Sequence, residues 1–291
     1  MGGQWVQFVA GGLTVGAIYA LVALGFSIIF NASRVIDFAQ GEFVMIGGMS
    51  AVSLVAAGAP MPVAILGAVA VSGVVGLLLE RLAVGQARNA DVVTLIIITI
   101  GASILLRGLA QLVWDKRIHP LPPLSGDTPI SIFGATIVPQ SLWVIGVTVV
   151  IVALLSWFFN RTLAGKAMLA TSYNRFAAQL VGIEVRRVLF ASFGLAAALG
   201  AIAGVLIAPI TFTSYDTGIM LGLKGFAAAI LGGLGNFAGA IAGGLVLGLL
   251  ESLGAGYVSS AYKDVIAFVI ILAVLFVRPD GILGAVKSER V

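Results

Sequence analysis

The sequence predicts an all-α membrane protein, a helical bundle in which about eight apolar segments cross or enter the bilayer. Of its 291 residues, 60% are hydrophobic and only 10% are charged, whereas a soluble domain carries roughly 25% charged residues. The mean hydropathy is +1.15. No soluble core could bury this much apolar surface, so the solvent must be lipid.

The apolar runs divide one transmembrane domain, residues 1–291, into segments close to the 20 residues that cross a bilayer. No basic residue precedes the first run, residues 5–30, which favours a true span over a cleaved signal peptide. The other continuous runs cover residues 43–58, 61–79, 92–113, 141–159, 188–209 and 264–278.

Residues 221–250 are apolar but interrupted by the glycines at 232–235. A straight helix of this length would extend about 45 Å at 1.5 Å per residue, which is too long for one span. The interruption therefore predicts either two full spans or a re-entrant pair of half-helices, and the half-helices are favoured.

Positive charge assigns the two sides of the membrane. Residues 160–188 carry five basic residues against Glu184, and therefore the whole net charge of +4. Because Lys and Arg concentrate in cytoplasmic loops, we expect this loop and the C-terminus inside and the N-terminus outside. Residues 114–140, rich in proline and containing a hairpin-like alternation, become an ordered extracytoplasmic excursion. Apolar flanks disfavour nucleic acid as a partner of so short a basic stretch.

Few residues suit catalysis, metal binding or cofactor binding. The chain has no cysteine, and its single histidine, His119, stands beside a proline in the excursion, where a structural or solvated role is expected. The pair Gly165 and Lys166 lacks the remaining residues of a phosphate loop. We therefore expect no catalytic site, no metal, no cofactor and no ATP binding by this chain itself.

Charges within the membrane are expected to be scarce. Every Asp and Glu is placed at a segment edge or in a loop, and Arg107 is the one charge well inside a run. Its long side chain is expected to reach the headgroups or to pair with Asp115. Ion-coupled carriers usually bury carboxylates at mid-membrane, so their absence favours an external energy source. No fixed charges suited to the two ends of an amino acid are recognised.

Glycines four residues apart predict close contacts between helices. Gly235, Gly239 and Gly243 would share one helix face, which another backbone can approach closely. Asn236 lies beside the break and is a pathway candidate, because irregular backbone at membrane depth faces protein or a wet cavity.

The polar segment at residues 31–43 supplies the other pathway or gate candidates. Arg34 and Asp37 are three residues apart and could pair on one helical turn. Residues 37–48 also resemble residues 236–244, a faint internal repeat of the kind common in transporters. The candidates for the pathway or a gate are Arg34, Asp37, Gln40 and Glu42.

A short helix is predicted in the cytoplasmic loop. Asn174 can cap it, Arg175 to Val181 give about two turns, and Gly182 suits the position that ends a helix. Its small apolar face consists of Phe176, Leu180 and Ile183. Because so short a helix is unstable alone in water, it needs a surface, either lipid headgroups or a soluble partner.

Four motifs in order resemble the Liv-type branched-chain amino acid ABC importer permeases, in their LivH-like half. They are RVIDFAQGEFVMIGG at 34–48, AAQLVGIEVRR at 177–187, AAILGGLGNFAGAIAGGLVLGLLE at 228–251 and VRPDGILG at 277–284. The resemblance covers about residues 5–285.

This resemblance implies a type II importer-like permease in the bacterial cytoplasmic (inner) membrane. It implies a homologous LivM-like second permease, two cytoplasmic ATP-binding subunits and a periplasmic substrate-binding protein as partners. Family permeases dock a cytoplasmic coupling helix into a groove on the ATPase, and alternating access follows at the interface of the two permeases. The matching positions here are Asn174, Arg175, Phe176, Leu180, Val181, Gly182 and Ile183.

The sequence departs from the family pattern at one motif. It has DFAQGE at 37–42 where many relatives have Asn-Phe-Ala-His-Gly-Glu, so Asp37 and Gln40 differ. The substrate therefore stays open between branched-chain amino acids and urea, amides or aromatic acids. A stand-alone channel or secondary carrier for a small polar solute is the alternative function. The basic amphipathic loop and the absence of buried charges both disfavour it.

Overall fold

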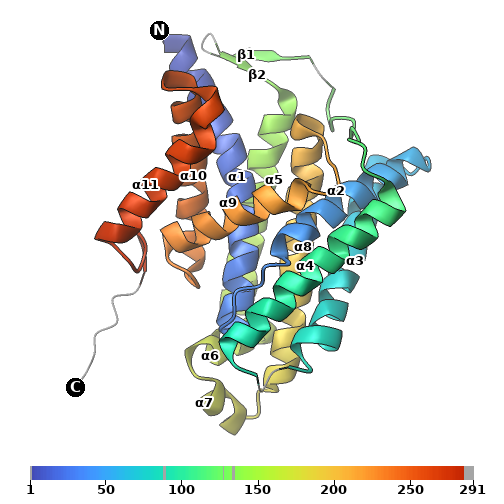
Figure 1. The fold of residues 1–291 in the computed structure, drawn as a ribbon, viewed down its shortest axis with the longest axis vertical. Coiled ribbons are helices and arrows are strands. Elements are labelled where there is room, and N and C mark those ends of the chain that lie inside the picture. The colour runs from blue at the N-terminus through green and yellow to red at the C-terminus, as the bar shows by residue number, and fades with distance from the viewer. Residues whose placement is uncertain (1, 88–89, 127, 133–134, 285–291) are drawn as a thin grey trace.

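The computed structural model describes residues 2–87, 90–126, 128–132 and 135–284, which form a bundle of helices with one small hairpin (Figure 1). The helices are α1 Gly2–Ser33, α2 Gln40–Ala56, α3 Met61–Leu79, α4 Val92–Trp114, α5 Pro139–Arg161, α6 Leu163–Tyr173, α7 Arg175–Leu180, α8 Val185–Thr211, α9 Thr217–Gly232, α10 Phe237–Tyr257 and α11 Lys263–Val277. A π-helical turn, η1 Glu80–Val84, extends α3, and a 3₁₀ turn, η2 Ser260–Tyr262, precedes α11.

Seven helical segments within the described residues are long and apolar enough to cross a membrane, counting η1 with α3 and η2 with α11. The helices α2 and α9 are apolar but shorter, with 17 and 16 residues. The predicted all-α polytopic fold is therefore confirmed. The glycine-broken segment 221–250 is two helices, α9 and α10, separated at residues 233–236 as expected.

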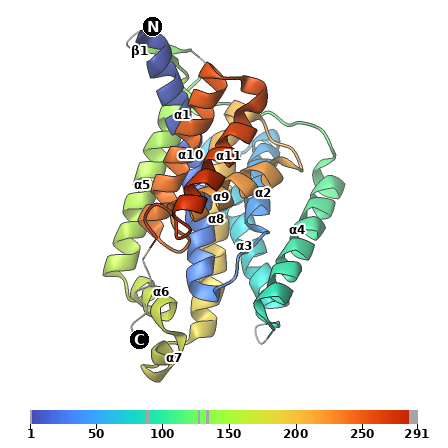
Figure 2. The same ribbon diagram turned by 60° about the vertical axis from the view of Figure 1, so that its left-hand side comes forward.

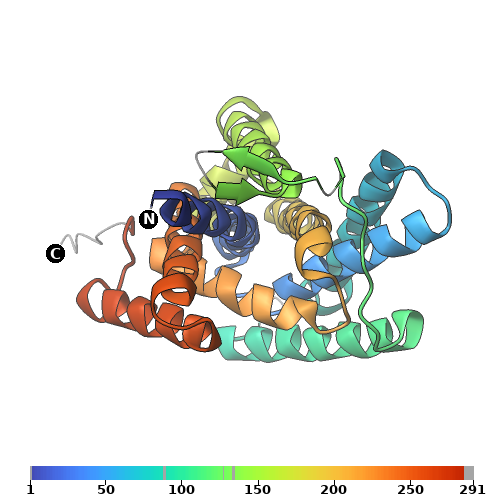
Figure 3. The same ribbon diagram turned by 90° about the horizontal axis from the view of Figure 1, so that it is seen from above.

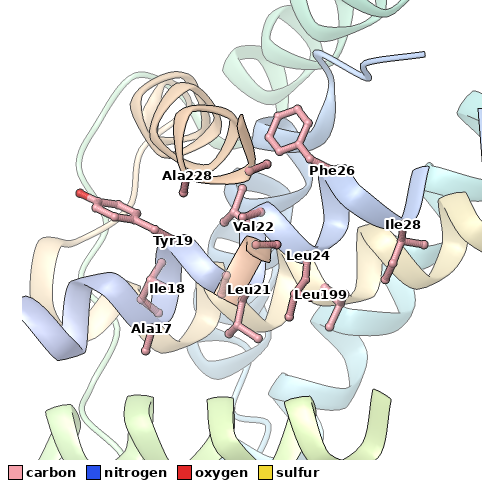
Figure 4. Close-up of a cluster of buried hydrophobic side chains, with 14 of the residues drawn as sticks. Ala17, Ile18, Tyr19, Leu21, Val22, Leu24, Phe26, Ile28, Leu199 and Ala228 are labelled. Atoms are coloured by element: carbon pink, nitrogen blue, oxygen red, sulfur yellow. The ribbon is translucent and has the colours of Figure 1, made fainter. Parts of the chain in front are cut away.

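The helices surround a central α1. In Figures 1 and 2, the N-terminus and the hairpin lie at one end of the bundle, and α6 and α7 lie at the other. Seen from above in Figure 3, α4 and α11 lie along one outer side, next to α9. Figure 4 shows part of the core, in which side chains of α1 pack with Leu199 of α8 and Ala228 of α9 in one cluster.

The predicted extramembrane excursion is ordered over its described part. Strands β1 Ile130–Ile132 and β2 Ala135–Ile137 pair antiparallel, which confirms the hairpin. The side chain of Gln7 in α1 exchanges two hydrogen bonds with the backbone of Thr136. His119 forms a two-way backbone bridge with Thr213 after α8, at 2.8 and 3.0 Å, so this end of the bundle is tied together.

Glycines set the closest helix contacts. A β-carbon added at Gly12 or Gly16 would meet the Cα atom of Leu249 or Leu245 in α10, each at 2.9 Å. Without side chains at these positions the two backbones approach closely, which strengthens dispersion contacts where lipid offers no hydrophobic driving force. The four-residue glycine step therefore has the packing role that was predicted for it.

The predicted shared face of Gly235, Gly239 and Gly243 is only partly correct. Gly239 and Gly243 do face α9, where an added β-carbon would overlap the backbone of Gly232 or Ala228. Gly235 instead precedes α10 and has a φ of +89°. Its carbonyl accepts a hydrogen bond of 2.7 Å from Asn31, because the helix has not yet begun at this residue.

We predict that Gly243→Ala lowers the free energy of unfolding by about 1–3 kcal/mol, because the added methyl group overpacks a backbone contact. Thermal unfolding in detergent measures the change. Gly146→Ala in α5 is the matched control, since its added β-carbon meets nothing within 4 Å. Similar melting temperatures for the two variants would contradict the packing role.

Candidate functional site

Helix α7 has the end signals that the sequence predicts. The Asn174 side chain accepts a hydrogen bond of 3.0 Å from the Ala177 amide. At the other end, the Gly182 amide donates to the Gln179 carbonyl and the Ile183 amide donates to the Ala178 carbonyl, both at 3.0 Å. With Gly182 at a φ of +84°, these two bonds form a Schellman motif that closes the helix.

The apolar face of α7 differs from the one predicted. Phe176, Leu180 and Val181 are 71, 72 and 76% exposed. Ile183 is partly buried and packs against the main core, because the Schellman turn redirects the chain toward the bundle. The exposed apolar surface of α7 and its C-cap therefore consists of Phe176, Leu180 and Val181.

Two arginines connect the segment α6–α7 to the end of α1. Arg175, the first residue of α7, donates to the carbonyl of Ala32, and Arg34 donates to the carbonyl of Ser172 near the end of α6. Burial and the neighbouring positive charge of Arg34 lower the pKa of Arg175. Charge-assisted hydrogen bonds of this kind are among the stronger ones in proteins, so the start of α7 is fixed to the end of α1.

The expected ion pair between Arg34 and Asp37 is wrong. Residues 34–39 are not helical, and Arg34 itself has a φ of +59°, so the geometry of a helical turn is absent. Arg34 is exposed, whereas Asp37 is buried and accepts a hydrogen bond of 2.9 Å from the Ala39 amide. Asp37 therefore stabilises the turn into α2.

The other two candidates of this segment are buried at the start of α2. Gln40 is fully buried and donates from Nε2 to the Ala196 carbonyl of α8 at 3.1 Å. Glu42 is 2% exposed. Its Oε1 accepts a hydrogen bond of 2.8 Å from Ser103 and lies 3.2 Å from Nε of Arg107, both in α4.

This pairing overturns two expectations. Arg107 contacts Glu42 and Ser103 and does not pair with Asp115. Glu42 is also buried, at 2% exposed, because the link after α1 returns into the bundle before α2 begins (Figure 1). A residue at the start of a helix can thus be enclosed by other helices, so a position at a segment edge does not imply exposure.

A second group of buried charges was missed. Lys224 of α9 lies 2.8 Å from Glu251 of α10 and 2.7 Å from Asp264 of α11. The hydroxyl of Tyr19 in α1 donates to the other oxygen of Glu251 at 2.7 Å. The sequence signal was Lys224 itself, since a lysine inside an apolar run requires a partner in the membrane. This group joins four helices.

Asn236 has structural contacts in the break between α9 and α10. Its side-chain oxygen accepts a hydrogen bond of 3.0 Å from the Gly239 amide and caps α10. Its Nδ2 donates to the Leu283 carbonyl at 2.7 Å. The break is therefore held by protein contacts, and the role of Asn236 in a pathway stays a prediction.

Two hollows accompany these residues. One of about 650 Å³ lies beside α7 and is lined by residues of η1, α7 and the start of α8, Arg175 and Glu80 among them. The other, about 170 Å³, lies between α2, α4 and α9 next to Glu42 and Arg107. The first hollow thus accompanies the candidate residues at the α7 end, and the second accompanies Glu42 inside the bundle.

Comparison with known proteins gives a consistent set of relatives. The family model described as branched-chain amino acid transport system / permease component matches residues 8–275. The chain is 34% identical to the high-affinity branched-chain amino acid transport system permease protein LivH of Escherichia coli, over 99% of this chain and 98% of that protein. It is equally similar, with the same coverage, to the permease protein BraD of Pseudomonas aeruginosa.

A solved structure has a similar fold. PsaBC from Streptococcus pneumoniae, determined in complex with Fab, matches with a TM-score of 0.53 over 94% of this chain and 93% of that one. The sequence identity is 15%, so the similarity concerns the fold.

We predict that Asn174→Ala destabilises α7 by about 1 kcal/mol through loss of the cap, which corresponds to about fivefold faster amide exchange. Hydrogen exchange at Ala177 and Ala178 measures it. Asn174→Asp keeps a side-chain oxygen acceptor and serves as the control, with rates close to the original. Unchanged exchange in the alanine variant would show that the cap does not support the helix.

Proposed function

Because this chain belongs to the family of branched-chain amino acid transport permeases, we propose that it is the membrane permease subunit of an ATP-binding-cassette importer for branched-chain or closely related small amino acids. It is a transport component of such a system and not an enzyme. The observation that carries this proposal is the similarity to LivH and BraD over nearly the full length of all three chains. Residues 1–291 then act as one permease domain.

An importer of this class requires partners that hydrolyse ATP and deliver substrate. We assign ATP hydrolysis to two cytoplasmic subunits, delivery to a periplasmic binding protein, and the other half of the pathway to a homologous LivM-like permease. The chain lies in the bacterial cytoplasmic membrane as a multi-pass protein. Its loop 160–188 and its C-terminus are cytoplasmic, in keeping with the basic charge of that loop and its position opposite the N-terminus (Figure 2).

Helix α7 is the contact with the ATPase in this proposal. Its exposed Phe176, Leu180 and Val181 form an apolar knob on a segment that is otherwise basic, which suits insertion into a groove of a soluble partner. The Arg175 bond to Ala32 and the Arg34 bond to Ser172 then carry the motion to the α1–α2 link. Alternating access follows as this link and α2 shift at the interface with the second permease.

The alternative of a stand-alone channel or carrier receives no support from the relatives. The expected absence of buried charges no longer counts against this alternative, because Glu42, Lys224 and Glu251 are buried. The case for an ATP-driven importer therefore depends on the family and on α7, and not on an absence of buried carboxylates.

Uptake measurements test the function. Deleting the gene for this chain is expected to reduce cellular uptake of radiolabelled leucine, isoleucine and valine, and expression of the chain should restore it. Uptake of radiolabelled urea in the same cells is the comparison. A system that takes up urea but no branched-chain amino acid would overturn the proposed substrate class.

The coupling role is tested by Phe176→Asp combined with Leu180→Asp. Each buried apolar anchor contributes about 2 kcal/mol at an interface, so we expect leucine uptake and co-purification of the ATPase both to fall more than about tenfold. Leu163→Asp is the control, because Leu163 is 88% exposed at the same end of the molecule but lies in α6. Docking at α7 is refuted if the double variant keeps both properties at equal abundance.

A further inference from the structure

The pocket between α2, α4 and α9 extends into the bundle and is open to the outside. Ser103 and Arg107 come from the middle part of α4, and Glu42 comes from the first turn of α2. Ile100 and Leu223 line the pocket and are themselves 41 and 45% exposed. The pocket therefore opens between α4 and α9, two helices that lie next to each other in Figure 3.

The polar side of this pocket contains a carboxylate oxygen without a hydrogen-bond partner. Glu42 uses Oε1 for Ser103 and Arg107, but its Oε2 is buried and accepts no hydrogen bond. The Arg107 side chain remains 26% exposed. A buried carboxylate oxygen without a partner is costly, so this atom is suited to a ligand that brings a positive charge.

The buried charges around Lys224 offer a comparison, because their polar atoms already have partners. Both oxygens of Glu251 are occupied, one by Tyr19 at 2.7 Å and one by Lys224 at 2.8 Å. Lys224 also contacts Asp264. Glu42 and Arg107 differ because they line a pocket and because one carboxylate oxygen is free.

The remaining walls of the pocket are apolar. Phe26, Phe38 and Phe226 line one side, where Phe226 lies 5.6 Å from each of the other two ring centroids in a tilted arrangement. Ile219 adds aliphatic surface. The volume of about 170 Å³ is below the roughly 300–1,000 Å³ of pockets for drug-sized ligands, so the pocket suits a small solute.

We propose that this pocket is a binding site for the transported amino acid within the permease, which rests on the proposed function. The free Oε2 of Glu42 receives the α-ammonium group, Arg107 receives the α-carboxylate, and the phenylalanine side holds the branched apolar side chain. Charge-assisted hydrogen bonds at both ends and an apolar wall together select a zwitterion with an aliphatic side chain. The permease thereby contributes to selectivity beyond any external binding protein.

Ligand protection of an introduced cysteine tests this site, because the chain contains no cysteine. The variant Ile219→Cys places a thiol on the pocket wall, and Met220→Cys places one on the neighbouring residue, which does not line the pocket. In membrane vesicles that contain the complete transport system, L-leucine at ten times its Kd should slow thiol labelling of the first variant about tenfold. Labelling of the second variant should be unchanged.

The chemistry of recognition is tested with analogues and charge variants. Isoamylamine and isocaproate each lack one of the two charged groups of leucine, so neither should protect Ile219→Cys at the leucine concentration used. Adding Glu42→Gln should weaken protection by leucine about tenfold or more, whereas Glu184→Gln, in the cytoplasmic loop, should not. The analogue comparison stands even if the Glu42 variant fails to fold.

Two outcomes overturn the proposal. One is labelling of Ile219→Cys that leucine does not slow in vesicles that accumulate leucine. The other is protection by isocaproate or isoamylamine that equals protection by leucine, which would show that the site does not require both charged groups of the amino acid. Failure of the original system to accumulate leucine would instead refute the proposed function, so the two failures are distinguishable.

Discussion

Direct backbone contact through glycine is the constraint on which this bundle depends. In lipid, helices gain little from burying apolar side chains against each other, so association requires close packing. Gly12 and Gly16 bring α1 against α10, and Gly41 brings α2 against Gly218 of α9. These crossings place the two short helices, α2 and α9, against the long central helices. Gln40 and Glu42 of α2 and Lys224 of α9 are thereby buried inside the bundle.

This arrangement explains how the protein holds buried charges, because charged residues from different helices meet as ion pairs inside the bundle. The link after α1 returns into the bundle, so α2 begins at membrane depth and brings Glu42 to Arg107. The charge of Lys224 is matched by Glu251 and Asp264 from two other helices. Breaking one member of such a buried group leaves an uncompensated charge, and the helices are therefore held in one register.

The two candidate clusters are connected through the α1–α2 link. At the α7 end, Arg175 and Arg34 bind the carbonyls of Ala32 and Ser172. Within eight residues of Arg34 the chain reaches Glu42 in the pocket wall. A displacement of α7 by a partner therefore has a short covalent and hydrogen-bonded route to the pocket. Under the proposed function, energy input and solute recognition would lie at opposite ends of this one irregular segment.

The sequence by itself determined the features that depend on local chemistry or on total composition. The apolar runs predicted the long helices and the break at residues 233–236. Asn174 and Gly182 predicted α7, because helix caps and membrane spans depend on residues that are close together in the sequence. Which side chains meet was decided only by the tertiary structure. Arg107 found Glu42, 65 positions away, Ile183 turned inward, and Arg34 and Asp37 separated at a non-helical turn. The physical reason is that side-chain pairing inside a membrane depends on where tilted and broken helices cross. The position of a crossing cannot be predicted from a local sequence pattern.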